Sequence, residues 1–129
     1  MIKLQGCVDQ NYMVLGLGRS GMASVGALTA SGANVICWDD DEETRSLASS
    51  KGFQIKNTIS DFDWQSIDRL IISPGIPHHF PLQHPIITAA ISAGVLVDND
   101  VGLFFQSVAT ESWSNFSVRP KIVAVTGSN

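Results

Sequence analysis

The chain has 129 residues, of which 44% are hydrophobic and 16% charged, and its formal net charge is −4. This size suffices for one domain with a hydrophobic core and is too small for two. The acidic balance excludes an extended basic surface for nucleic acid, because few Lys and Arg side chains are available to neutralise phosphates. No apolar run is long enough to cross a bilayer, so membrane insertion is not expected. An anionic ligand would have to be held by backbone N–H groups and a helix terminus.

The two cysteines, Cys7 and Cys37, do not form the pattern of a disulfide framework. Cys37 lies inside an apolar strand pattern, where a thiol behaves as a small hydrophobic group. We therefore expect a soluble protein of the reducing cytoplasm.

Five short apolar runs predict strands, at residues 12–16, 34–38, 69–73, 95–97 and 122–125. Most of them are too continuously apolar for half-exposed strands, and such runs are typical of a parallel sheet buried on both faces.

Helical patterns alternate with these runs, at residues 20–30, 42–51, 85–93 and 101–108. Glycine follows the first three as a stop signal, and Asp100 is the expected N-cap of the fourth. The alternation predicts an α/β fold of the Rossmann-like, doubly wound type, with a mainly parallel sheet and helices on both faces.

A glycine-rich loop, GLGRSG at residues 16–21, joins the first predicted strand to the first helix. Gly16 permits the tight turn, Gly18 lets the backbone approach a pyrophosphate, and Gly21 allows close contact between helix and strand. The helix N-terminus then offers N–H groups to an anion. The alternative is a purely structural turn, and Arg19 is either a charge partner of the ligand or an exposed loop residue.

Asp39 ends the second predicted strand, about 20 residues after the glycines, where a dinucleotide fingerprint has an acid for ribose hydroxyls. This position makes a nicotinamide or flavin dinucleotide the default expectation. Asp40 and Asp41 are interpreted as a solvated turn before the next helix.

The segment SPGIP, residues 73–77, follows the third long strand. Ligands of open α/β sheets bind at the carboxyl ends of strands, so this turn would face the same crevice as the glycine loop. It could equally be a rigid turn. The histidines after it, His78, His79 and His84, are interpreted as surface residues, because no Cys or carboxylate has a spacing that suits a metal site.

The end of the chain, IVAVTGSN at 122–129, combines a strand with the first residues of a phosphate-binding loop. Such a loop continues with a lysine for the phosphates and a Ser or Thr for magnesium. The residues that would begin it are Thr126, Gly127, Ser128 and Asn129.

The expected organisation is therefore a ligand-binding domain at 1–109, a polar linker at 110–120, and the beginning of a further, ATP-binding domain at 121–129. This division predicts that the chain alone binds a ligand, contains no catalytic residue and does not turn over ATP.

Four motifs in this order, GLGRSG, SPGIP, DVGLF at 100–104 and AVTGSN at 124–129, resemble the N-terminal portion of the Mur ligases. The resemblance covers essentially the whole chain. It is strongest to the member that joins D-glutamate to UDP-N-acetylmuramoyl-L-alanine in peptidoglycan synthesis.

The resemblance implies that this domain binds the UDP part of the substrate and no redox cofactor. The residues that it implies for UDP are Gly16, Gly18, Arg19, Ser20, Gly21, Asp39, Asp40, Ser73, Gly75 and Ile76. It implies ATP and Mg²⁺ for the whole enzyme, with no metal held by this chain. Two positions depart from the family: it commonly has an acid where Gly102 stands, and the counterpart of Asp40 is often not acidic.

Two other functions compete with this one. One is an NAD(P)-binding domain of an oxidoreductase or of a nucleotide-sensing regulator, since fold alone does not settle function. The other is a non-catalytic paralogue or a truncated product. The terminal TGSN favours the ligase, because a dehydrogenase has no reason to follow its first nucleotide unit with a second phosphate loop.

Overall fold

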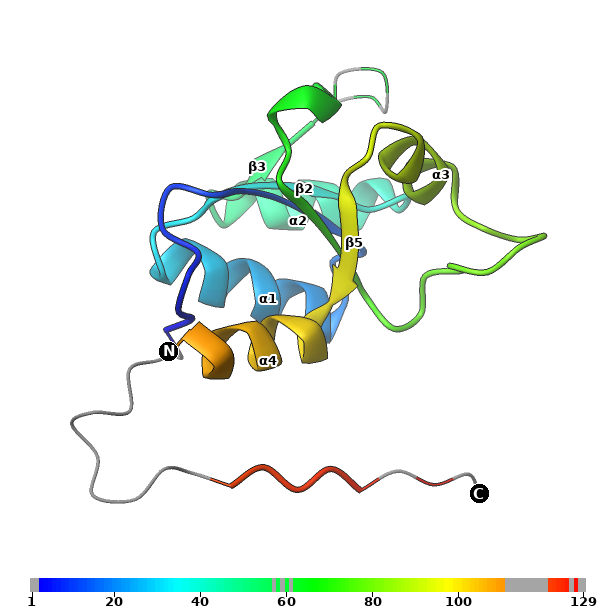
Figure 1. Cartoon of the computed structure of the whole chain (residues 1–129). Coiled ribbons are helices and arrows are strands. Elements are labelled where there is room, and N and C mark those ends of the chain that lie inside the picture. Colours follow the sequence, from blue (N-terminus) through cyan, green and yellow to red (C-terminus); the bar gives the residue numbers. More distant parts are fainter. Residues whose placement is uncertain are drawn as a thin grey trace.

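The computed structural model describes residues 3–56, 58, 60, 62–110, 121–125 and 127 (Figure 1). Strands and helices alternate as the sequence predicts. In chain order they are β1 (Asn11–Leu15), α1 (Arg19–Ala30), β2 (Asn34–Trp38), α2 (Glu42–Ser50), β3 (Gln54–Ile55), the 3-10 helix η2 (Trp64–Ser66), β4 (Arg69–Ile72), α3 (Pro85–Ser92), β5 (Leu96–Asn99) and α4 (Asp100–Thr110).

The strands form one parallel sheet in the order β3-β2-β1-β4-β5. The chain builds outward from β1 through β2 and β3, and then crosses back to place β4 on the other side of β1. This reversal is the switch point at which open α/β sheets bind ligands. The doubly wound, Rossmann-like fold is therefore confirmed, and its crevice lies beyond the carboxyl ends of β1, β2 and β4.

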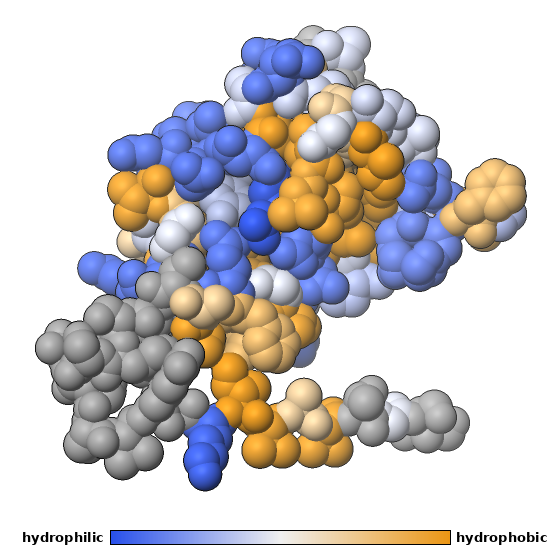
Figure 2. All heavy atoms as spheres, viewed as in Figure 1, coloured by the Kyte–Doolittle hydropathy of each residue, from blue (hydrophilic) through white to orange (hydrophobic). Residues whose placement is uncertain are grey.

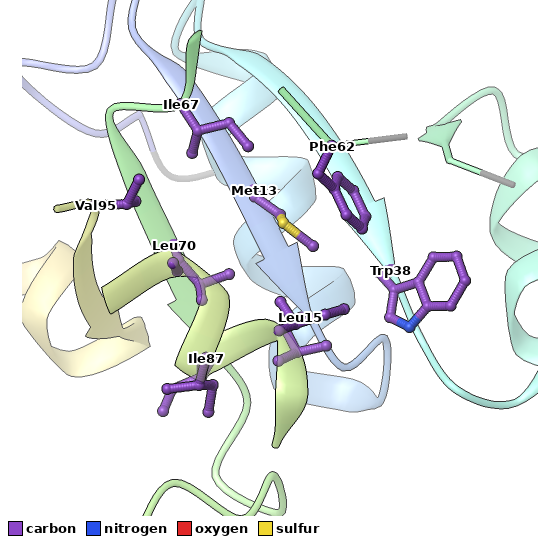
Figure 3. Close-up of a cluster of buried hydrophobic side chains, with 11 residues drawn as sticks. Met13, Leu15, Trp38, Phe62, Ile67, Leu70, Ile87 and Val95 are labelled. Atoms are coloured by element: carbon purple, nitrogen blue, oxygen red, sulfur yellow. The ribbon is translucent and has the colours of Figure 1, made fainter. Parts of the chain in front are cut away.

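Alternate residues of each strand point to opposite faces of the sheet, and each face has its own core. On one face Met13 and Leu15 of β1 pack with Leu70 of β4 and Ile87 of α3 (Figure 3). On the other face Val14 packs in a cluster to which α1, α2 and α4 each contribute a buried side chain. Helices therefore cover both faces, as predicted.

The fifth strand extends two residues beyond its predicted end, through Asp98 and Asn99. The sequence pattern missed them because they are polar. Asp98 is held by an ion pair of 2.8 Å with Arg69 on the neighbouring strand β4. Asn99, and not Asp100, caps α4, because its Oδ1 accepts a hydrogen bond from the Gly102 N–H at 2.9 Å.

Gly102 lies directly against Asp98. A Cβ atom built on Gly102 would overlap the Asp98 carboxylate, with its Oδ2 at 2.5 Å. The space that a side chain at this position would need is therefore already filled by an acid from the strand below.

The strand predicted at 122–125 is not present in the structure. Residues 121–125 have no regular secondary structure, and the side chains of Val123 and Val125 are 83% and 92% exposed. Figure 2 shows this stretch as hydrophobic residues at the surface. A strand needs the backbone of a neighbouring strand as its hydrogen-bond partner, and none of the five strands of the described sheet pairs with it.

Candidate functional site

A cleft of about 400 Å³ opens where the loops after β1, β2 and β4 meet. It brings together every residue that the sequence analysis assigned to UDP except Gly21 and Asp40. The lining residues are Gly16, Gly18, Arg19, Ser20, Asp39, Ser73, Pro74, Gly75 and Ile76.

The glycine loop is fixed to the strands on both sides of it. Gly16 has a φ of +87°, a conformation that favours glycine, and its N–H donates to the Trp38 carbonyl of β2 at 2.8 Å. The Ser73 hydroxyl donates to the Gly16 carbonyl at 2.7 Å from the end of β4. Ser73 therefore supports the loop in addition to lining the cleft.

The two remaining glycines of the loop have opposite surroundings. A Cβ on Gly21 would overlap the Gly16 carbonyl and come within 2.8 Å of the Ser73 hydroxyl, so α1 can approach β1 only if this residue is glycine. A Cβ on Gly18 would meet no atom within 4 Å, because it would project into open space in the cleft. Gly21 thus acts in packing, and Gly18 keeps space free.

The N-terminus of α1 lies at this cleft, since Gly18, Arg19 and Ser20 line it. Gly18 is the N-cap residue and supplies no side-chain hydrogen bond, whereas Asp41 caps α2 and His84 caps α3. The first N–H groups of a helix have no intrahelical acceptor and carry the positive end of the helix dipole. An uncapped terminus beside Arg19 and Ser20 is suited to an anion such as a diphosphate.

Asp39 supports the same loop from β2. Its Oδ2 accepts a hydrogen bond from the Leu17 N–H at 2.7 Å, and its Oδ1 accepts one from the Asp41 N–H at 3.0 Å. Each oxygen keeps a further lone pair for a ligand hydroxyl. The carboxylate predicted as a ribose ligand therefore also holds the glycine loop in place.

Asp40 does not line the cleft. Its Oδ1 accepts from the Trp38 indole N–H at 3.0 Å, and its Oδ2 lies 2.9 Å from Nε2 of His84. Partial burial acts to raise the pKa of this carboxyl, but the hydrogen bonds from Trp38 and His84 outweigh it and lower the pKa below its usual value. The Asp40 side chain is nevertheless 67% exposed, so Asp40 lies in a solvated turn before α2 as predicted, and it also binds Trp38 and His84.

Asp41 caps α2 and does not belong to the cleft. Its Oδ2 accepts from the Thr44 hydroxyl at 2.6 Å and from the Thr44 N–H at 2.8 Å. These hydrogen bonds from Thr44 lower the pKa of the Asp41 carboxyl. The sequence signal for this role was present, since an acid directly before a helix is a common N-cap.

Arg45 is a contributor that the sequence analysis missed. Its Nη1 donates to the carbonyl oxygens of Asp39 at 2.7 Å and of Asp40 at 2.9 Å, while its guanidinium lies 4.7 Å from the centroid of the Trp38 ring. Arg45 therefore holds the loop after β2 from the helix that follows it. The sequence did not predict this contact, because a charged residue in an amphipathic helix is expected on the solvent-exposed face.

The three histidines do not form one cluster. His78 and His79 are exposed and stack on each other with ring centroids 4.0 Å apart. His84 is only 9% exposed, so its interpretation as a surface residue is wrong. Among the residues that the structure describes, no three His, Cys, Asp or Glu side chains are grouped in a way that could hold a metal ion.

The predicted linker begins at Thr110, which is the last residue of α4, and its other residues, 111–120, lie outside the described residues. Thr126, Ser128 and Asn129 lie outside them too, and Gly127 is exposed. Within the described part of the chain, no helix combines the length and the apolar character that crossing a bilayer requires.

The family model described as "Mur ligase MurD-like, N-terminal domain" matches residues 10–98. This range contains all three loops of the cleft. A protein of Roseobacter denitrificans named UDP-N-acetylmuramoylalanine–D-glutamate ligase is 49% identical over all 129 residues. The chain spans only 28% of the length of that relative.

Two solved structures share the fold. Shikimate dehydrogenase from Aquifex aeolicus aligns with a TM-score of 0.57 at 14% identity, over 81% of this chain and 47% of its own. The NAD(P)-binding domain of an exopolyphosphatase-related protein from Archaeoglobus fulgidus aligns with a TM-score of 0.56 at 25% identity, over 68% of this chain and 70% of its own.

Proposed function

Since the chain belongs to the MurD-like N-terminal domain family of the Mur ligases, we propose that it binds the UDP part of UDP-N-acetylmuramoyl-L-alanine. The observation that carries the proposal is the cleft itself, in which an uncapped helix N-terminus meets a glycine loop and the SPGIP turn. The relative from Roseobacter denitrificans supports the choice of substrate, because its name contains this compound as an acceptor of D-glutamate.

The diphosphate of the substrate would lie at the N-terminus of α1. Backbone N–H groups of the first turn would donate to its oxygens, and Gly18 would leave space for them. Arg19 and Ser20 line the cleft beside this terminus and would supply a positive charge and a hydroxyl. Gly21 would contribute indirectly, through the close approach of α1 to β1.

The uridine would lie between the loops after β2 and β4. Asp39 would accept from a hydroxyl of the nucleoside with the lone pairs that Leu17 and Asp41 leave. Ser73, Gly75 and Ile76 would form the opposite wall. Asp40, whose carboxylate is engaged by Trp38 and His84, would act on the ligand only through the backbone of its loop.

For the whole enzyme we propose the ADP-forming ligation of D-glutamate in peptidoglycan synthesis. ATP with Mg²⁺ would supply the phosphoryl group that activates the alanine carboxylate. The chain's own contribution would be remote binding energy, since holding the UDP part positions the distant carboxylate for reaction.

The proposed organisation keeps a UDP-binding domain at 1–109, a linker at 110–120 and the beginning of an ATP-binding domain at 121–129, with Thr126–Asn129 in its phosphate loop. The cytoplasm is the proposed compartment, and the cysteines support it because both are buried free thiols. Burial raises the pKa of Cys37 to about 12, so this thiol is unreactive at neutral pH.

We expect the chain to bind UDP weakly and saturably, and to bind NADH not at all. Isothermal titration of the same preparation with both ligands measures this directly. The NAD(P)-binding domain from Archaeoglobus fulgidus is the reason for the second ligand, because its fold is shared. Binding of NADH without a response to UDP would replace the proposed function with the dinucleotide alternative.

A further inference from the structure

His84 makes hydrogen bonds with both of its ring nitrogens, and this fixes its tautomer. Nδ1 accepts from the Ile86 N–H at 3.1 Å, as the N-cap of α3. A nitrogen that accepts carries no proton, so in the neutral ring the proton is on Nε2. Nε2 therefore donates to Asp40 Oδ2, at 2.9 Å.

The backbone of His84 makes a third connection. Its N–H donates to the carbonyl of Pro77, the last residue of the SPGIP turn, at 2.9 Å. Asp40 directly follows Asp39, which holds the glycine loop through Leu17. One buried residue thus connects the loop after β2 with the turn after β4. Both segments contribute residues to the cleft, and they lie on either side of the glycine loop because β1 lies between β2 and β4.

Resting on the proposed function, we propose that the Asp40–His84 hydrogen bond sets the separation of the two cleft walls, and that both side chains are positioning residues for UDP. Neither side chain lines the cleft. Asp40 also accepts from the Trp38 indole and its carbonyl accepts from Arg45, so its side of the connection is held by two further hydrogen bonds. A ligand that fits this separation of the two walls would bind without the entropic cost of ordering the loops after β2 and β4.

Two substitutions of His84 separate the cap from the connection between the walls. Asn places an oxygen where Nδ1 lies and is among the best N-cap residues, but it does not reach Asp40. Gln places an amide N–H₂ where Nε2 lies, and lacks an acceptor at the Nδ1 position. His84→Asn should therefore keep the cap and lose the connection, whereas His84→Gln should do the reverse.

The experiment is titration of UDP into the chain and its variants, together with thermal melts. We expect His84→Asn to weaken UDP binding roughly five- to tenfold, the size of one lost hydrogen bond, with little change in melting temperature. His84→Gln should bind UDP nearly as well as the wild type, at a lower melting temperature. His79→Asn, an exposed histidine of the same loop, is the matched control and should change neither quantity.

Asp40→Ala provides an independent arm. It removes both carboxylate oxygens, so His84 and Trp38 each lose their acceptor. It should weaken UDP binding at least as much as His84→Asn does, and the double variant should be no weaker than Asp40→Ala alone, because Asp40→Ala already removes the interaction that His84→Asn removes.

The outcomes separate this inference from the proposed function. A wild-type chain that binds no UDP would overturn both. UDP binding that is normal in His84→Asn, or that falls in His84→Gln in step with melting temperature, would overturn the positioning role alone and leave His84 as a helix cap.

Discussion

Replacing Gly21 with alanine should lower the free energy of unfolding by on the order of 3 kcal/mol, at the upper end of the usual cost of overpacking. The added Cβ would overlap the Gly16 carbonyl, which is backbone and is held by the Ser73 hydroxyl at 2.7 Å. Relief would require α1 to move away from β1, which would also loosen Val25 and Leu28 in the core. Urea denaturation followed by circular dichroism measures the change.

Gly75→Ala is the matched control for this prediction. Gly75 lies in the same cleft, and a Cβ there would meet no atom within 4 Å. Its stability should stay within about 0.5 kcal/mol of the wild type. Equal stabilities of the Gly21→Ala and Gly75→Ala proteins would show that α1 does not pack on the glycine loop as described.

Replacing Gly18 with valine should abolish UDP binding and leave the fold largely intact. The backbone of Gly18 is extended, with φ −65° and ψ −167°, so a side chain is tolerated there. The new side chain would occupy the space in front of the first turn of α1, where we propose that the diphosphate lies. Titration with UDP and a thermal melt of the same sample distinguish loss of binding from loss of structure.

Gly18→Asp tests the electrostatic part of the same proposal. Aspartate is a good N-cap and should maintain or slightly raise the stability of α1. Its negative charge would satisfy the helix terminus and repel a diphosphate, so UDP binding should disappear while the melting temperature does not fall. If Gly18→Val and Gly18→Asp both bound UDP normally, the glycine loop would be only a turn.

The fold could be predicted from the sequence because its signals are local. Continuous apolar runs predicted the parallel strands around Met13 and Leu70, and the stop glycines gave the helix ends within a residue or two. The sequence patterns missed the two-residue strand β3 and the polar end of β5. Each is only two residues long, which is too short for an apolar run or an alternation of apolar and polar residues to be recognised. The strand predicted at 122–125 is not formed in this chain, since β-branched composition gives a tendency and pairing depends on a neighbouring strand.

The lining of the cleft could also be predicted, because glycines, a strand-end acid and a Ser-Pro-Gly turn are signals that adjoin the strands. The residues that hold these loops could not. Arg45 and His84 act through contacts across 6 and 44 positions of the sequence, with Asp39 and Asp40 respectively. Arginine and histidine are also common on exposed surfaces, so only the three-dimensional structure distinguishes these two supporting residues from ordinary surface residues.

Asp98 and Gly102 have a consequence for how this family diverges. Because the carboxylate of one fills the space that a side chain on the other would need, the two positions should covary among homologues. In relatives with an acid where Gly102 stands, we expect a residue without a carboxylate where Asp98 stands, so that a single acid remains within reach of the counterpart of Arg69. A side chain at 102 would require either a smaller residue at 98 or an Asp98 carboxylate that turns away from α4 and gives up its ion pair with Arg69.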